Sequence, residues 1–147
     1  TLDGIVQVSR EKVSLLQILE QIRRYMLQTL LPSARRVTIH VGGKDVIVSA
    51  DCASSVALVV NELVQNALKY AFPSGQAGRI GIELHSGRPL CQLTVWDNGV
   101  GFQADRPRPG GAGLELASTI VREKLTGEWS VESGPGGTRI SFDFLEQ

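Results

Sequence analysis

The order of helical and extended patterns along the chain constrains its fold more than any other feature of the sequence. Apolar residues recur at helical spacing in three segments and alternate with polar residues in six others, as they do in strands. Because the extended segments come in consecutive pairs separated by helices, we predict an α+β fold. It would be a two-layer sandwich with three helices on one face of a mixed, mostly antiparallel sheet. The predicted helices cover residues 13–31, 53–72 and 114–125, and the predicted strands cover residues 36–41, 45–49, 79–84, 90–96, 129–132 and 138–144.

Two local patterns mark the ends of the first elements. Ser14 is in position to cap the first helix, and Pro32 would end it. Gly42 and Gly43 form a tight-turn pattern between the first two strands, which predicts a β-hairpin. Residues 97–113 are rich in glycine and proline, so we expect an irregular loop before the last helix.

Size and charge exclude several classes of protein. The chain has 147 residues, which fits a single domain with a substantial core. Lysine plus arginine total 15, as do aspartate plus glutamate, so no overall field attracts nucleic acid or anionic membrane. No apolar run approaches the roughly 20 residues that span a bilayer. Cys52 and Cys91 lack metal-binding spacing and are expected to be free thiols, which makes the cytoplasm the default location.

The second predicted helix carries a polar stripe that packing does not require. Glu62, Asn66 and Lys69 are spaced i, i+4, i+7, so their side chains lie along one edge of the helix. Apolar residues cover the other side and form a core face. The stripe has two readings. It is either a solvated face with a weak Glu–Lys interaction, or a row of ligands for a metal ion and phosphate.

The glycines gather in two segments, DNGVGF at residues 97–102 and GGAGL at residues 110–114. A glycine-rich loop that leads into a helix N-terminus offers unpaired N–H groups and suits phosphate, although glycines also simply turn chains. Asp97 ends a buried strand just before these glycines. Its carboxylate can accept a hydrogen bond from an exocyclic amine such as that of adenine, or it can form an Asx-turn.

Four motifs occur in a fixed order. They are Glu-x-x-x-Asn at 62 and 66, Asp-x-Gly-x-Gly at 97, 99 and 101, Gly-x-Gly at 111 and 113, and Gly-Gly-Thr at 136–138. From residue 36 to 144 the chain resembles the Bergerat-type ATP-binding domain shared by DNA gyrase, the Hsp90 chaperones, MutL and the histidine kinases. NELVQNALKYAFP and the ending from Gly111 to Phe144 are similar to bacterial sensor histidine kinases, most of all to the subgroup whose asparagine box begins Asn-Glu-Leu.

The resemblance gives the polar stripe a chemical role, with ATP and Mg²⁺ as cofactors. Asn66 would bind Mg²⁺ through its side-chain oxygen, with the metal bridging the ATP phosphates. Lys69 would approach the phosphates as a point charge. Glu62 would orient a water or take a proton from the attacking group, or only hold a metal-bound water.

The resemblance also implies a nucleotide pocket. Asp97 would accept from adenine N6, helped by Thr138 through a water, and Tyr70 would either flank the nucleotide or pack against the core. Residues 103–110 would form a lid. The backbone would approach the base at Gly99 and Gly101, and the phosphates would be held by Gly111, Gly113 and Leu114 at the start of the last helix.

A histidine kinase also needs an acceptor histidine on a helical hairpin. The only histidines, His40 and His85, fall in or beside predicted strands, so neither resembles an acceptor. We therefore expect the acceptor and dimerisation domain upstream, with residues 1–12 as a linker from it. A response regulator would be a further partner, and no contact with nucleic acid or membrane is expected. Two alternatives are a stand-alone serine kinase of the anti-sigma-factor type and a nucleotide-binding regulatory module without transfer activity.

Overall fold

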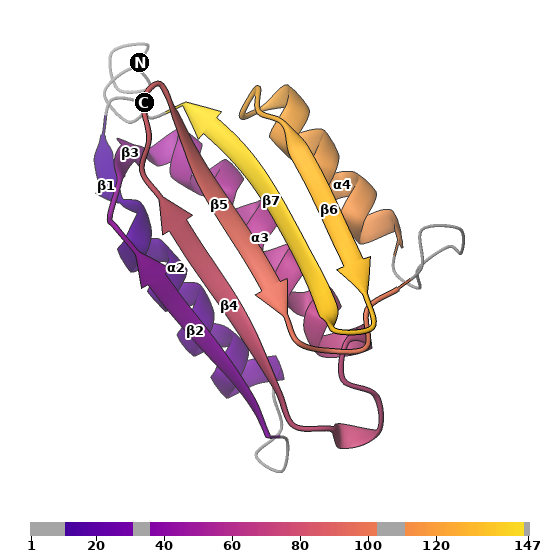
Figure 1. Ribbon diagram of the computed structural model, residues 1–147. Helices are drawn as coiled ribbons and strands as arrows, with labels where there is room; N and C mark the ends of the chain where they lie inside the picture. Colours follow the sequence, from indigo (N-terminus) through magenta and orange to yellow (C-terminus); the bar gives the residue numbers. More distant parts are fainter. Residues whose placement is uncertain (1–10, 31–35, 103–110, 146–147) are drawn as a thin grey trace.

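The computed structural model describes residues 11–30, 36–102 and 111–145. Three helices cover one face of a five-stranded sheet, and the other face is open (Figure 1). The strand order is β2-β4-β5-β7-β6, with β2 parallel to β4 and every other pair antiparallel, so the predicted α+β sandwich is confirmed. The elements are β1 (Lys12–Ser14), α2 (Leu15–Tyr25), the π-helical η1 (Met26–Leu30), β2 (Val37–Gly43), β3 (Ile47–Ser49), α3 (Ala50–Tyr70), the 3₁₀ turn η2 (Pro73–Gly75), β4 (Gly78–His85), β5 (Leu90–Asp97), α4 (Gly111–Glu123), β6 (Trp129–Gly134) and β7 (Gly137–Leu145).

The predicted hairpin between residues 36–41 and 45–49 is wrong. Strand β2 pairs in parallel with β4, whereas β3 pairs with β1 in a separate two-stranded sheet. The chain leaves the main sheet at Gly43, whose φ of +110° brings its Cα against the backbone of Leu84. The Asp45 carboxylate then accepts hydrogen bonds from the Ser14 hydroxyl and the Leu16 N–H at the start of α2. These bonds hold the segment between β2 and β3 against α2, away from the position that a β2–β3 hairpin would need.

Helix α2 begins where the sequence predicts. The Ser14 hydroxyl accepts a hydrogen bond from the Gln17 N–H at 3.2 Å, so Ser14 is the N-cap. Residues 12–14 themselves form the short strand β1, which the sequence pattern did not predict. The α-helix continues as η1 rather than as a regular helix to residue 31, and Pro32 lies outside the described residues.

Helix α3 crosses the middle of the sheet and supplies much of the core. It begins at Ala50, three residues before the predicted start, because the Ser49 hydroxyl caps it by accepting from the Cys52 N–H. Strands β4, β5 and β7 place alternate side chains beneath the helices, and Cys52 and Cys91 are buried free thiols in this layer. The inward side chains of these three strands are Ile80, Ile82, Leu84, Cys91, Leu93, Val95, Ile140, Phe142 and Phe144.

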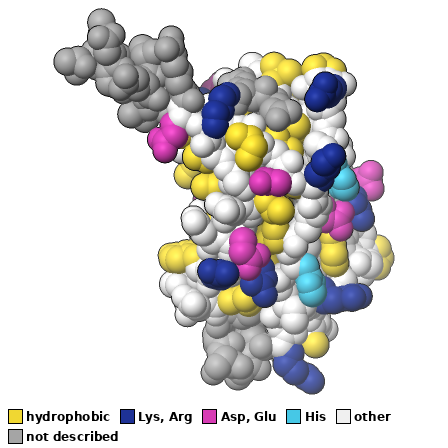
Figure 2. All heavy atoms as spheres, turned by 90° about the vertical axis from the view of Figure 1, so that its left-hand side faces the viewer, with side chains coloured by type: hydrophobic (Ala, Val, Ile, Leu, Met, Phe, Trp, Pro, Cys, Tyr) yellow, Lys and Arg dark blue, Asp and Glu magenta, His cyan; other side chains and the backbone are white. Residues whose placement is uncertain are grey.

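The remaining surface carries both signs of charge. On the side where α2 and β2 lie, acidic and basic side chains are interspersed (Figure 2). On the open face of the sheet, the indole of Trp96 lies over Gly81, where any Cβ would overlap it, and its Nε1–H donates to Glu83 at 3.1 Å. Within the described residues, no helix is long and apolar enough to cross a membrane.

Candidate functional site

The polar stripe of α3 is not a uniform solvated face. Lys69 is exposed and Glu62 is half-buried, but Asn66 is only 6% exposed. Its Nδ2 is buried without a hydrogen-bond partner among the described residues. A buried polar group without a partner costs about 1–3 kcal/mol, so native structures keep such groups rare. Among the described residues, Asn66 is therefore the side chain that would gain most from a hydrogen bond or metal contact with a ligand.

The first turn of α4 lies directly over Glu62 and Asn66. A Cβ placed on Gly113 would be 2.7 Å from Glu62 Oε2 and 3.1 Å from Asn66 Nδ2, so only glycine fits here without moving these side chains. Helix α4 begins at Gly111, three residues earlier than predicted, which puts Gly111 and Gly113 inside its first turn. The N–H groups of a first helical turn have no partner within the helix and carry the positive end of its dipole. Such a turn beside the polar stripe suits an anion.

Asp97 ends β5 on the same side of the sheet and is 8% exposed. Its Oδ1 accepts a hydrogen bond from the Gly99 N–H at 2.9 Å, so the Asx-turn reading holds. An ionised carboxylate has two oxygens and about four lone-pair positions, so this turn does not exhaust its capacity to accept. The Val100 N–H donates to the Ala71 carbonyl at 2.9 Å, which ties the loop to the end of α3.

The loop glycines are required by close backbone packing. Gly99 lies against the backbone of Ala71, and Gly101 lies against the backbone of Gly134 with a φ of +70°. Both positions exclude a side chain even without a ligand, so these glycines have a structural reason that is independent of nucleotide binding. The backbone at these glycines forms the surface next to Asp97.

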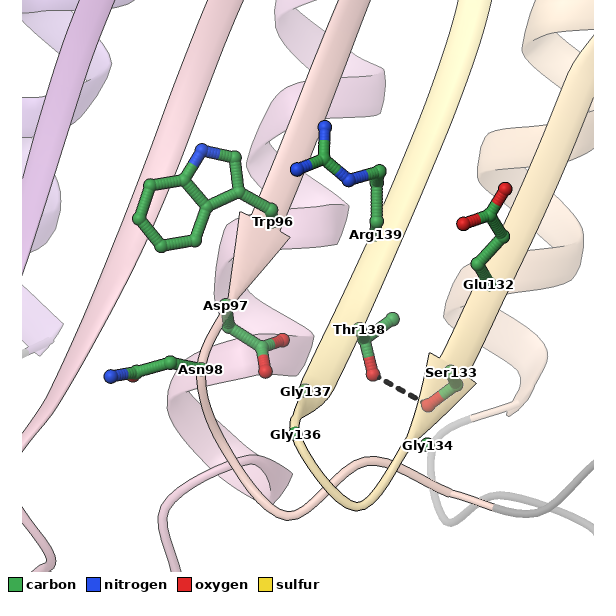
Figure 3. Close-up of a pocket in the computed structure, with 10 residues that line it drawn as sticks. All are labelled: Trp96, Asp97, Asn98, Glu132, Ser133, Gly134, Gly136, Gly137, Thr138 and Arg139. Atoms are coloured by element: carbon green, nitrogen blue, oxygen red, sulfur yellow. Dashed lines mark hydrogen bonds between the residues drawn. The ribbon is translucent and has the colours of Figure 1, made fainter.

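Thr138 faces Asp97 from the neighbouring strand. The two residues are cross-strand partners, and Thr138 is 5% exposed. The Thr138 and Ser133 hydroxyl oxygens are 2.7 Å apart (Figure 3). Ser133 Oγ also accepts from the Phe102 N–H at 2.8 Å. A cavity of about 420 Å³ opens at this end of the sheet. Its lining residues are Trp96, Asp97, Asn98, Glu132, Ser133, Gly134, Gly136, Gly137, Thr138 and Arg139.

Most of the predicted site residues gather at one end of the sheet, in two groups. Glu62 and Asn66 meet the start of α4, while Asp97 meets Thr138 at the ends of β5 and β7. The C-terminal end of α3, the start of α4 and the β6–β7 turn lie at this same end (Figure 1). Lys69 points into solvent, and the cavity beside Asp97 does not include Asn66. Tyr70 and Leu114 are half-buried. The predicted lid, residues 103–110, lies outside the described residues.

Sequence reasoning missed Ser133 as a member of this site. The predicted strands 129–132 and 138–144 lie close together in the sequence, and in the hairpin that joins them Ser133 stands opposite Thr138. Extending the strand register by one pair beyond Glu132 would have found it.

The two histidines lie in strands, as predicted. His40 is an exposed residue of β2, and His85 ends β4 with its Nε2 3.7 Å from a Glu83 carboxylate oxygen. Both are on the open face of the sheet, because the residues that alternate with them, such as Ile39 and Leu84, point toward the helices. Within the described residues, no group of three or more histidine, cysteine, aspartate or glutamate side chains could hold a metal ion.

Comparison with known proteins agrees with this geometry. Residues 52–147 match the family described as "Histidine kinase-, DNA gyrase B-, and HSP90-like ATPase". The chain is 27% identical over 144 residues to the sensor histidine kinase PdtaS of Mycolicibacterium smegmatis, covering 94% of this chain and 28% of that protein. It is 31% identical over 112 residues to blue-light-activated histidine kinase 2 of Erythrobacter litoralis, covering 73% of this chain and 32% of that protein.

Solved structures give the same picture. The histidine kinase domain of a blue-light activated histidine kinase from Erythrobacter litoralis superposes with a TM-score of 0.78 at 25% identity. The match covers 90% of this chain and 65% of that one. The chain spans only about a quarter to a third of the curated relatives that it matches.

Proposed function

Because the chain belongs to the family of histidine kinase-, DNA gyrase B-, and HSP90-like ATPases, we propose that it is the ATP-binding catalytic domain of a sensor histidine kinase. It transfers the γ-phosphoryl group of ATP to a histidine on a separate dimerisation domain, in the cytoplasm. A response regulator then takes the phosphoryl group from that histidine. The curated relatives are named as sensor or light-activated histidine kinases, which favours this reading over a stand-alone serine kinase.

The proposal depends most on the environment of the Asn66 side chain. Its amide is buried, lacks a partner for Nδ2 among the described residues, and adjoins Glu62 and the first turn of α4. A half-turn of the amide exchanges Nδ2 and Oδ1, so this position can present a donor to a phosphate oxygen or an acceptor to a cation. Mg²⁺ prefers oxygen ligands and is usually held by few protein groups together with substrate phosphates. When bound here, the ion would neutralise charge on the β- and γ-phosphates.

The neighbouring groups divide the remaining tasks. The free N–H groups of the first turn of α4 hold phosphate oxygens, and the exposed ammonium of Lys69 adds a mobile positive charge. Glu62 lies between α3 and α4 and takes the proton of the attacking group or positions a water. At the sheet end, Asp97 accepts from the adenine amine, Thr138 contacts the ring, and Tyr70 flanks the base.

Three substitutions separate these roles. Asn66→Ala is expected to abolish Mg²⁺-dependent transfer and to remove the Mg²⁺ enhancement of ATP binding. Lys69→Ala is expected to weaken ATP binding by about tenfold, the effect of one charged hydrogen bond, with little effect on adenosine. Glu62→Gln is expected to keep ATP affinity but slow transfer, since the amide keeps the shape and loses the base.

Titration calorimetry with and without Mg²⁺ measures binding, and phosphorylation of a separately purified histidine-bearing dimerisation domain measures transfer. Ser54→Ala, an exposed position near the start of the same helix, is the control. If Asn66→Ala and Glu62→Gln both transfer phosphate at the wild-type rate, the stripe takes no part in phosphoryl transfer. ATP binding without any transfer to such a domain would instead indicate a regulatory nucleotide-binding module.

A further inference from the structure

Ser133 joins two parts of the candidate site through its single hydroxyl group. Its Oγ accepts from the Phe102 N–H at 2.8 Å and lies 2.7 Å from the Thr138 Oγ1. Phe102 ends the described part of the loop that follows Asp97, and Thr138 stands opposite Asp97 in the sheet. Figure 3 shows the Ser133 and Thr138 hydroxyls meeting at the mouth of the β6–β7 turn. Neither the sequence motifs nor the family resemblance gives Ser133 a role.

The Phe102 N–H favours one direction for this hydrogen-bond chain. A backbone N–H can only donate, so Ser133 Oγ is the acceptor in that bond. A hydroxyl that accepts a hydrogen bond becomes a better donor, because successive bonds polarise one another. The favoured direction therefore runs from the Phe102 N–H to Ser133 Oγ, and from the Ser133 hydroxyl to Thr138 Oγ1. Thr138 then accepts from Ser133, which leaves its own proton to donate to a group bound beside Asp97.

A donating Thr138 complements the neighbouring carboxylate. Asp97 can only accept when ionised, so the pair presents one acceptor and one donor side by side. Adenine offers the matching pattern at its edge, with a donor amine at N6 and an acceptor at the ring nitrogen N1. Guanine reverses both, with an acceptor O6 and an N1–H donor. The hydroxyl direction at Thr138 thus decides which purine the site accepts, either directly or through a bridging water.

We infer that Ser133 is a positioning residue that directs the Thr138 hydroxyl proton toward the nucleotide, and that it thereby contributes to selection of adenine by its unprotonated N1. This inference rests on the proposed ATP-binding function and adds a specificity-determining residue to the same site.

The test compares ATP with its deaza analogue, in which N1 is replaced by C–H. The wild-type chain should bind ATP more tightly than the analogue, because only ATP accepts from Thr138. Ser133→Ala should weaken ATP by about fivefold, the size of one neutral hydrogen bond, and leave the affinity for the analogue unchanged. Ser133→Thr, which keeps the hydroxyl, should restore the preference. Thr138→Val should lose it, and adding Ser133→Ala to Thr138→Val should cost nothing further.

A matched control exists in the same sheet. Ser141 and Thr94 form a second cross-strand hydroxyl pair at 2.9 Å on the open face, so Ser141→Ala removes an equivalent bond away from the site and should leave both affinities unchanged. Equal weakening of ATP and the analogue by Ser133→Ala would mean a merely structural role and would overturn the inference, as would no weakening at all. If Ser133→Ala does not fold, Ser133→Cys of similar volume and weak donor strength answers the same question. A wild-type chain that binds no ATP would instead overturn the proposed function.

Discussion

At the scale of single residues, several side chains of the site serve the fold and the proposed ligand together. Asp97 closes an Asx-turn with the Gly99 N–H, and in the proposed function the same carboxylate also accepts from the adenine amine. Asn66 differs, because its buried Nδ2 makes no hydrogen bond with the described residues. In the proposed function, this unpaired group lowers the stability of the free chain and is available to a ligand.

Asp97→Asn tests base recognition without disturbing the turn, because the amide oxygen can still accept from the Gly99 N–H. ATP affinity should fall by about tenfold or more, since a charge-assisted hydrogen bond of about 1.5–3 kcal/mol is lost. GTP should bind poorly to the wild-type chain, and calorimetry with both nucleotides measures these effects. Glu132→Gln changes an exposed carboxylate that lines the same cavity and is the control. Equal affinities of the wild-type chain for ATP and GTP would refute the assignment.

At the scale of elements, the site depends on how closely α4 approaches α3. Gly113 permits this contact because it presents no side chain to Glu62 and Asn66. The N-terminal turn of α4 can therefore bring its free N–H groups to the same place as the polar stripe. A contact between distant segments also fixes the start of α2. Asp45 accepts hydrogen bonds from the Ser14 hydroxyl and from the Leu16 N–H.

Gly113→Ala should separate function from stability. The added methyl would displace only the far ends of the Glu62 and Asn66 side chains and no backbone, so thermal stability should change little. Transfer should fall by about tenfold or more, because misplacement of reacting groups by an ångström can cost on the order of 100-fold. Thermal unfolding and the phosphotransfer assay measure the two effects. Gly42→Ala, at a strand position with open space around it, is the control, and a Gly113→Ala variant with full activity would contradict the packing argument.

Asp45→Ala should destabilise the fold in a pH-dependent way. Desolvation opposes ionisation of Asp45, but hydrogen bonds from the Ser14 hydroxyl and the N–H groups of Leu16 and Val46 outweigh it, so the pKa of this carboxyl lies below its usual range. The loss should be about 1 kcal/mol near neutral pH, as for a helix cap. A lowered folded-state pKa gives stability that is complete above the unfolded-state pKa and is lost as the pH falls through the folded-state value. Urea unfolding should therefore show the difference from wild type shrinking in acid. A difference that persists or grows in acid would show that Asp45 acts through packing and not through its charge.

At the scale of the whole molecule, the sheet separates the polar stripe and the start of α4 from both histidines. Glu62, Asn66 and Gly113 meet on the helix side, whereas His40 and His85 are on the open face, so neither histidine can reach a γ-phosphate bound at α4. This arrangement agrees with a catalytic domain that phosphorylates another domain.

The isolated chain should therefore bind ATP but form almost no phosphohistidine. Labelled ATP and an assay for acid-labile phosphate would measure this, with the separately purified dimerisation domain added in a parallel reaction. The double variant His40→Ala/His85→Ala should transfer phosphate to that domain as the wild type does. Stable phosphorylation of His40 or His85 in the isolated chain would contradict the proposed division between domains.

The sequence by itself determined the helices, the strands of the main sheet and their inward faces. Ser14 caps a helix, and three helices and the strands of the main sheet occur close to where periodicity places them. These properties depend on residues a few positions apart, which periodicity and capping rules describe. The assignment of the motif residues to a nucleotide site stays a prediction.

Only the tertiary structure decided which elements meet. It paired β2 with β4 in place of β3, buried Asn66 beneath Gly113, and placed Ser133 between Phe102 and Thr138. A strand pattern states which side chains point inward but not which strand lies alongside, because every strand offers the same backbone N–H donors and carbonyl acceptors to any neighbour. The partner is selected by long-range packing and by contacts such as that of Asp45 with α2, and no local pattern encodes them.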